Sequence, residues 1–191
     1  MATIERIPKP KSALVTAQQF MEGNWGPGKK ELVRGEMIEV APDNYHDAFV
    51  SANISHVLSL HGKETTLGYA LCGDLGVRTE TAPDTVRGAD VAFYSRARLP
   101  YSRSAPGLPE VVPDLTVEVY SPSNRSSEIL GKVREYLDAG VLMVWVVHPN
   151  RRTVAIYRPD DPIPAILAEN DFVENLPELP GFRCPVAEFF D

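Results

Sequence analysis

The stretch PDLTVEVYSPSNRSSEILGKVREYLDAGVLMVW, residues 113–145, decides the fold. Residues 115–120 are apolar and rich in β-branched side chains, as a strand requires. Residues 125–139 have the composition of a helix, and Gly140 follows where such a helix would end. Residues 141–147 form a second apolar run. The order strand, helix, strand predicts a crossover unit, with two neighbouring strands and a helix packed on their sheet.

Glu118 interrupts the apolar pattern in the middle of the first strand. An unpaired carboxylate is costly in an apolar environment, so it must be exposed, paired or bound to a cation. Lys132 lies in the helix that follows and can point back toward the strand end. The segment can therefore bring a carboxylate and an ammonium group together at a sheet. A half-exposed glutamate and a solvated helix lysine remain the alternatives.

The bulk composition is that of an ordinary globular chain of 191 residues, which predicts one domain. No apolar run approaches the roughly 20 residues that span a bilayer, and the N-terminus has no secretory signal. Cys72 and Cys184 lack metal-ligand spacing and read as reduced thiols, so we expect a cytoplasmic protein. The net charge of −7 excludes a broad basic stripe for nucleic acid.

The remaining chain is expected to complete one α/β (α+β) domain around this unit. Residues 1–30 are predicted to form an arm and a short helix, 31–158 the core, and 159–191 an extension packed on the same domain. Within the core, the patterns predict a hairpin at 31–40, a helix at 45–61, short strand pieces at 69–77, 77–79 and 89–94, a long connection at 95–112 and a strand at 153–158.

A second acid, Asp90, opens an apolar strand in the same way. Two carboxylates suit a hard cation such as Mg²⁺ or Mn²⁺, which can polarise a phosphoryl oxygen and activate a bound water. Lys132 could orient that water or neutralise charge on the phosphate. Glu36 could add a third carboxylate, and His46, in the first turn of its helix, a base or phosphate contact. Taken alone, each of these residues also fits a role without function: a turn aspartate, a solvated lysine or a surface histidine.

Taken in order, these residues resemble the Uma2-like proteins, also called the DUF820 family, which are bacterial members of the PD-(D/E)XK nuclease superfamily. The resemblance covers about residues 31–157. The pieces that carry it are Glu31-Leu-Val-Arg-Gly-Glu36, His46, Ala89-Asp90-Val91, Pro113-Asp-Leu-Thr-Val-Glu118-Val-Tyr-Ser-Pro-Ser, Lys132 with Tyr136, Gly140-Val141 and Trp145-Val-Val-His-Pro149.

The resemblance implies a restriction-endonuclease-like core, in which helices flank a mixed β-sheet, and Mg²⁺-dependent cleavage of DNA by a homodimer. It assigns Asp90 and Glu118 as the metal acids and Lys132 as the catalytic lysine, moved from the strand to the next helix. It also assigns Glu36 as the early acid and His46 as its companion. One departure from the superfamily pattern is Tyr120, which stands where the lysine normally lies.

Two other functions remain open at this stage. The chain could be a DNA- or protein-binding module that keeps the nuclease fold without cutting, which the acidic composition favours. It could also hydrolyse a small phosphorylated or nucleotide substrate. In that case the arginines of the 95–112 connection, Arg96, Arg98 and Arg103, would clamp the phosphate.

Overall fold

One large β-sheet organises the molecule. The computed structural model describes residues 14–101, 107–121 and 124–191, so the first 13 residues and Arg103 lie outside the described residues. The sheet has eight strands in the order β2-β1-β4-β5-β6-β7-β8, and β3 pairs with β4 beside this path. Its strands are β1 (Lys29–Val33), β2 (Glu36–Val40), β3 (Gly68–Glu80), β4 (Thr85–Ser95), β5 (Leu115–Val119), β6 (Met143–His148), β7 (Thr153–Tyr157) and β8 (Ala165–Ala168).

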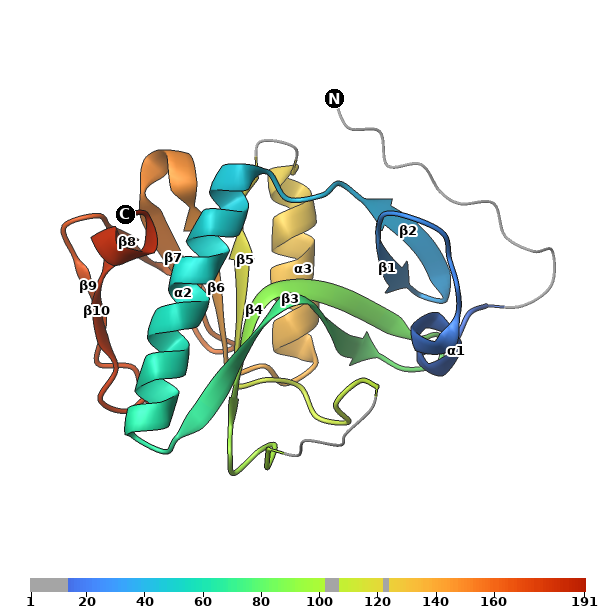
Figure 1. Ribbon diagram of the computed structural model, residues 1–191, viewed down its shortest axis with the longest axis horizontal. Coiled ribbons are helices and arrows are strands. Elements are labelled where there is room, and N and C mark those ends of the chain that lie inside the picture. The colour runs from blue at the N-terminus through green and yellow to red at the C-terminus, as the bar shows by residue number, and fades with distance from the viewer. Residues whose placement is uncertain (1–13, 102–106, 122–123) are drawn as a thin grey trace.

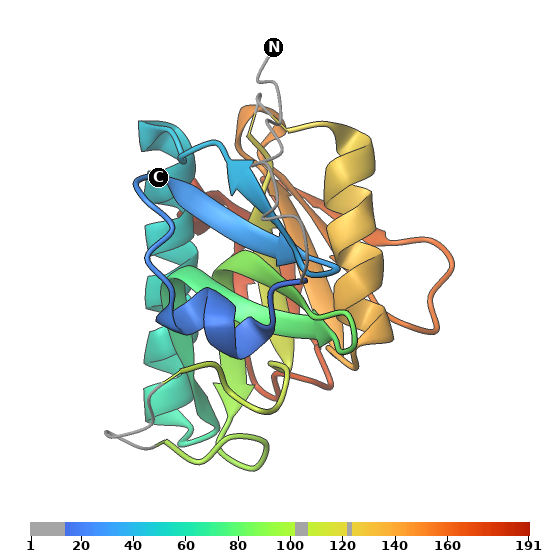
Figure 2. The same ribbon diagram turned by 90° about the vertical axis from the view of Figure 1, so that its right-hand side faces the viewer.

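Helices cover both faces of this sheet. The α-helices are α1 (Ala17–Glu22), α2 (Tyr45–Glu64) and α3 (Ser126–Asp138). Figure 2 shows α2 and α3 on opposite sides of the sheet, with α1 below the β1–β2 hairpin. The C-terminal region adds the 3-10 helices Pro149–Arg151 and Val186–Phe189 and a small sheet of β9 (Phe172–Glu174) and β10 (Arg183–Pro185). The predicted architecture, a mixed sheet flanked by helices, is confirmed.

The predicted crossover unit lies at the centre of the sheet (Figure 1). β5 and β6 run parallel, with Val117 beside Trp145, and α3 connects them. The other strand pairs of the sheet are antiparallel. Both central strands are buried along almost their whole length, which explains their near-continuous apolar sequences.

The region between residues 69 and 94 differs from its prediction. The short strand pieces are parts of two long strands, β3 and β4, that pair from Gly68 with Ser95 to Glu80 with Thr85. The ladder continues through glycines and charged residues that have low strand propensity, because pairing with neighbouring strands outweighs local preference. A register shift between Cys72 and Leu75 absorbs one irregularity.

Two apolar layers fill the space between sheet and helices. Val50, Ile54 and Leu58 place one stripe of α2 on a core that includes Trp145 and side chains of the C-terminal region. On the other face, a smaller cluster is formed by Ile129, Val133, Tyr136, Val144 and Val146, among others. Glu118 and Lys132 lie on this second face, so charged groups share the layer under α3. No helix among the described residues is long and apolar enough to cross a membrane.

Candidate active site

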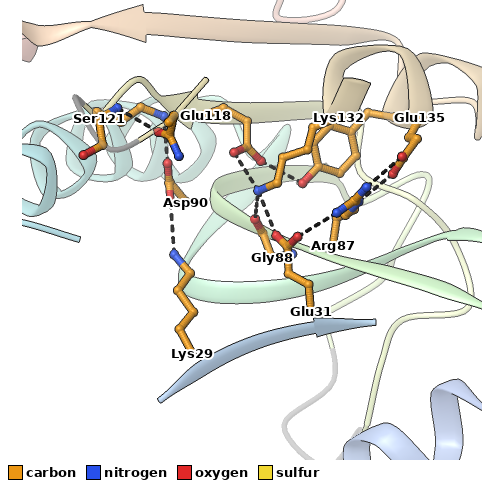
Figure 3. Close-up of polar contacts among 12 residues, drawn as sticks. Lys29, Glu31, Arg87, Gly88, Asp90, Glu118, Ser121, Lys132 and Glu135 are labelled. Atoms are coloured by element: carbon orange, nitrogen blue, oxygen red, sulfur yellow. Dashed lines mark hydrogen bonds and ion pairs between the residues drawn. The ribbon is translucent and has the colours of Figure 1, made fainter. Parts of the chain in front are cut away.

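The β1–β2 hairpin presents two charged side chains to the layer under α3. Its turn consists of Arg34 and Gly35, which both have positive φ angles of 50° and 74°, as a two-residue hairpin turn requires. Side chains alternate along β1, and Leu32 is fully buried in the cluster beside α1. Lys29 and Glu31 therefore point together toward the opposite face, where Lys29 meets Asp90 of β4 and Glu31 meets Lys132 of α3 (Figure 3).

Helix α3 brings an ammonium and a phenol to the buried glutamate of β5. Lys132 Nζ lies 2.9 Å from Glu118 Oε2, and the Tyr136 hydroxyl donates to Glu118 Oε1 at 2.8 Å. The two α3 residues are four positions apart, so they lie on one face of the helix. Glu118 is only 3% exposed and has its charge balanced by hydrogen bonds from both of them. The strand glutamate is therefore paired rather than solvated.

Lys132 is held on more than one side. Its Nζ also contacts Glu31 Oε1 at 2.8 Å and donates to the carbonyl oxygen of Gly88 at 3.0 Å. Glu31 in turn accepts hydrogen bonds from the Gly88 N–H at 3.1 Å and from Arg87 at 2.9 Å. Arg87 continues to Glu135 of α3 through two hydrogen bonds. The network fixes the position of the lysine and ties α3 to the sheet (Figure 3).

Asp90 approaches the same place from β4. The observed pairing of Val91 with Val117, extended by one position, sets Asp90 opposite Glu118 on neighbouring strands. Asp90 Oδ2 accepts the backbone N–H of Val119 at 2.7 Å, which fixes the carboxylate at the end of β5. The two acids expected to bind a metal therefore come from adjacent strands and share one side of the sheet.

A small cavity lies among the acids and lysines of the candidate site. Asp90, Glu118, Lys29 and Lys132 all line it, and its volume is about 30 Å³. A single water needs roughly 10–15 Å³ of such space. The cavity therefore has room for an ion or one or two waters and is too small for a nucleotide. A wider hollow of about 470 Å³ beside Arg98 contains none of these acids or lysines. A large substrate must therefore reach the cavity from its mouth.

The surroundings raise the pKa values of Asp90, Glu118 and Lys132. Burial, followed by repulsion from Glu118, raises the pKa of Asp90 to about 7. Burial also raises the pKa of Glu118, against the opposing effect of Lys132. Burial alone would lower the pKa of Lys132, but the charges of Glu118 and Glu31 outweigh it and hold that pKa above its ordinary value. Lys132 thus stays protonated, and the Val119 N–H, Lys29 and Lys132 compensate the charge of Asp90 only in part.

The donor set fits a hard divalent cation. The cluster contains four acids and three bases, so it keeps one net negative charge when all are ionised: Asp90, Glu118, Glu31 and Glu135 against Lys29, Lys132 and Arg87. Among the described residues, no three His, Cys, Asp or Glu side chains form a group that could hold a metal. Two carboxylates suffice for Mg²⁺ or Mn²⁺, because such ions keep several waters. The fit is therefore to a partly hydrated ion.

Two of the predicted site residues are not brought to Lys132 by any contact within the described chain. Glu36 lies at the turn end of the hairpin, opposite Val33, and the acid that contacts Lys132 is Glu31. His46 is exposed in the first turn of α2, where its backbone N–H donates to the Asn44 side chain. The roles of Glu36 and His46 stay predictions, as do the catalytic roles of Asp90, Glu118 and Lys132.

Sequence reasoning missed three participants, Lys29, Glu31 and Arg87. A signal for the first two was present, because residues two apart on a strand share a face. It also misjudged Arg98, whose guanidinium donates to the carbonyl oxygens of Val112, Pro113 and Gly140. That arginine braces the chain around the start of β5 and is not available to clamp a phosphate.

Tyr120, which the resemblance places at the expected position of the lysine, supports the start of α3. Its hydroxyl contacts the carbonyl oxygen of Asn124 and the hydroxyl of Ser126, and its ring packs on His148 with centroids 4.4 Å apart. The ammonium at the site comes instead from Lys132, one helix further along the chain.

Two comparisons with known proteins show the family and the fold of this chain. The model of a family described as "Uma2: Putative restriction endonuclease" matches residues 21–187. The crystal structure of "a putative nuclease belonging to DUF820" from Anabaena variabilis ATCC 29413 is similar, with a TM-score of 0.76, 19% sequence identity, and coverage of 92% of this chain and 97% of that chain. At this identity the likeness shows the fold. No curated protein matches the sequence.

Proposed function

Because this chain belongs to the Uma2 family, we propose that it is a nuclease that hydrolyses phosphodiester bonds in DNA with the help of Mg²⁺ or Mn²⁺. The observation that carries the proposal is the meeting of Asp90, Glu118 and Lys132 around one small cavity. Two buried acids and a buried lysine are an expensive arrangement that a structural role alone does not require.

In this proposal Asp90 and Glu118 hold the cation through their carboxylate oxygens. The bound cation supplies a Lewis acid for the phosphate and lowers the pKa of a water. Glu118 can take part although each of its oxygens already accepts a hydrogen bond, because a carboxylate oxygen has two lone pairs. Tyr136 fixes the orientation of that carboxylate from the opposite side.

Lys132 acts as a fixed positive charge. Its raised pKa keeps it protonated at neutral pH, so it donates hydrogen bonds and does not remove a proton. Its three N–H groups are taken by Glu118, Glu31 and the Gly88 carbonyl, so it acts through its charge and stabilises the negative charge that develops on the phosphate. Glu31 and the Gly88 carbonyl position the ammonium, and Arg87 keeps the charge of Glu31 compensated.

The test is cleavage of supercoiled plasmid with Mg²⁺ or Mn²⁺. We expect nicking by the wild type and a loss of roughly 100-fold or more in Asp90→Asn, Glu118→Gln and Lys132→Met, as for other electrostatic catalytic groups. Glu178→Gln is a matched control, because it removes a carboxylate from an ion pair of low exposure, with Arg158, outside the site. Cutting that persists in the three site variants would assign the activity to other residues or to a contaminant.

One observation favours a second candidate, a DNA- or protein-binding module without catalysis. Glu118 and Glu31 both pair with Lys132 within 2.9 Å, so the network is complete as a structural element. This candidate predicts DNA association that weakens with salt and is unchanged in Asp90→Ala. A shift assay with plasmid fragments, run beside the cleavage assay, separates the two.

A further inference from the structure

Lys29 belongs to the candidate site although it was not among the predicted site residues. It is the first residue of β1, its side chain is 11% exposed, and it lines the cavity with Asp90 and Glu118. Its Nζ lies 3.6 Å from Asp90 Oδ1. A largely buried ammonium thus stands beside the carboxylate oxygen that the Val119 N–H does not bind (Figure 3).

The contact between Lys29 and Asp90 is looser than the contacts that hold the other lysine. At 3.6 Å it is an ion pair without hydrogen-bond length, whereas Lys132 meets both of its acids within 2.9 Å. Lys29 also has a second acid at hand, because Asp43 Oδ1 lies 3.3 Å from its Nζ. The Asp43 side chain is 40% exposed, so this partner lies toward solvent.

We infer that Lys29 is an internal counter-ion of Asp90 that competes with the divalent cation. Lys29 already donates a hydrogen bond to Asp43, and the cation binds only when Lys29 leaves Asp90 and keeps this exposed partner. The inference rests on the proposed function, since it takes Asp90 as a cation ligand. An ammonium and a divalent ion seek the same negative charge, and they repel each other at the distances available in so small a cavity. Lys29 therefore sets how much cation the protein needs before its site is loaded.

The test compares Mn²⁺ affinity in three proteins by isothermal titration calorimetry. We expect Lys29→Met to lower the dissociation constant about tenfold or more, since one competing charge near the ion is removed. Lys30→Met is the matched control and should stay within about twofold of the wild type. Lys30 is the next residue, and its ammonium donates to the carbonyl oxygens of Pro27 and Gly28 rather than to the site acids.

Each outcome decides between the inference and the proposed function. Equal Mn²⁺ affinity in wild type and Lys29→Met, or weaker affinity in the variant, overturns the inference and leaves the nuclease proposal standing. Binding by Lys29→Met alone supports competition in its strongest form. Binding by neither protein removes the cation site, and both proposals fall.

Two further variants keep the test sharp. Lys29→Gln removes the charge but keeps a polar side chain, so the same gain in Mn²⁺ affinity is expected. It replaces Lys29→Met in the test if that variant does not fold. Adding Asp90→Asn to Lys29→Met should abolish the gain, because the inference locates the competition at that carboxylate. A gain in Mn²⁺ affinity that persists when Asp90→Asn is added contradicts the inference. Circular dichroism of each variant establishes that the proteins compared are folded.

Discussion

The pair formed by Lys132 and Glu118 gives a quantitative prediction for the substitution Lys132→Met. Methionine keeps the length and apolar stem of lysine but removes its charge, so Glu118 and Glu31 lose a partner within 2.9 Å. These acids are 3% and 2% exposed, so bulk water solvates them poorly once the ammonium is removed. Breaking a buried ion pair on one side costs about 3–5 kcal/mol. We expect that loss in the free energy of unfolding at pH 8.

The pH dependence of this cost has a definite sign. Burial already raises the pKa of Glu118, and removal of Lys132 raises it further above the value of an unfolded chain. An acid whose folded pKa is raised binds its proton more tightly in the folded state, so stability is lost as pH rises from about 4.5 through the folded pKa. The cost of Lys132→Met must therefore be smaller at pH 5 than at pH 8.

Urea denaturation in the presence of EDTA measures this cost, with Lys63→Met as the control. Lys63 is an exposed residue of α2, so its substitution should change stability by no more than about 0.5 kcal/mol. The double variant Lys132→Met/Glu118→Gln removes the stranded charge and should recover part of the loss at pH 8. A cost below about 1 kcal/mol for the single variant, or no recovery in the double, would refute the buried pair.

Three further predictions follow from single contacts. The pKa of Asp90 is raised from 3.8 to about 7, so the free energy of unfolding of the metal-free protein should fall as the pH rises from about 4 to 7. Asp90→Asn lacks this loss, so between pH 4 and pH 8 its stability relative to the wild type should rise by up to about 4 kcal/mol in urea titrations. Tyr136→Phe removes the hydroxyl that donates to Glu118 and should cost about 1.5–3 kcal/mol in the same assay. Gly131 lies in a helix, and a methyl group added there meets nothing within 4 Å, so Gly131→Ala should raise the melting temperature. A methyl group added at Gly62 would lie 2.5 Å from a carbonyl oxygen, so Gly62→Ala should lower the melting temperature.

The parts of the fold that the sequence predicted are those in which local pattern and tertiary structure agree. The helix predicted at 45–61 is α2 (Tyr45–Glu64), because its apolar stripe has the helical period and packs on the core. The strand and helix around Glu118 are β5 and α3, within one residue at each end. β3 and β4 were recognised only in pieces, because their continuity comes from pairing between strands that no local pattern contains.

The candidate site, like the fold, was predictable only where local sequence pattern brings its residues together. Lys132 and Tyr136 have helical spacing next to the strand that carries Glu118, so their meeting follows from a local crossover. Glu31 and Lys29 reach the site only because the hairpin docks on β4 with Leu32 opposite Val86.

The alternation of residues along β1 shows that Lys29 and Glu31 share a face, but not which neighbour that face meets. Glu36 shares the same face, two pairs further along the hairpin, but the prediction chose it from the family resemblance. The register of one docked hairpin decides which of two acids contacts the lysine. Because the acid that contacts Lys132 is Glu31, removal of each acid in turn separates their roles.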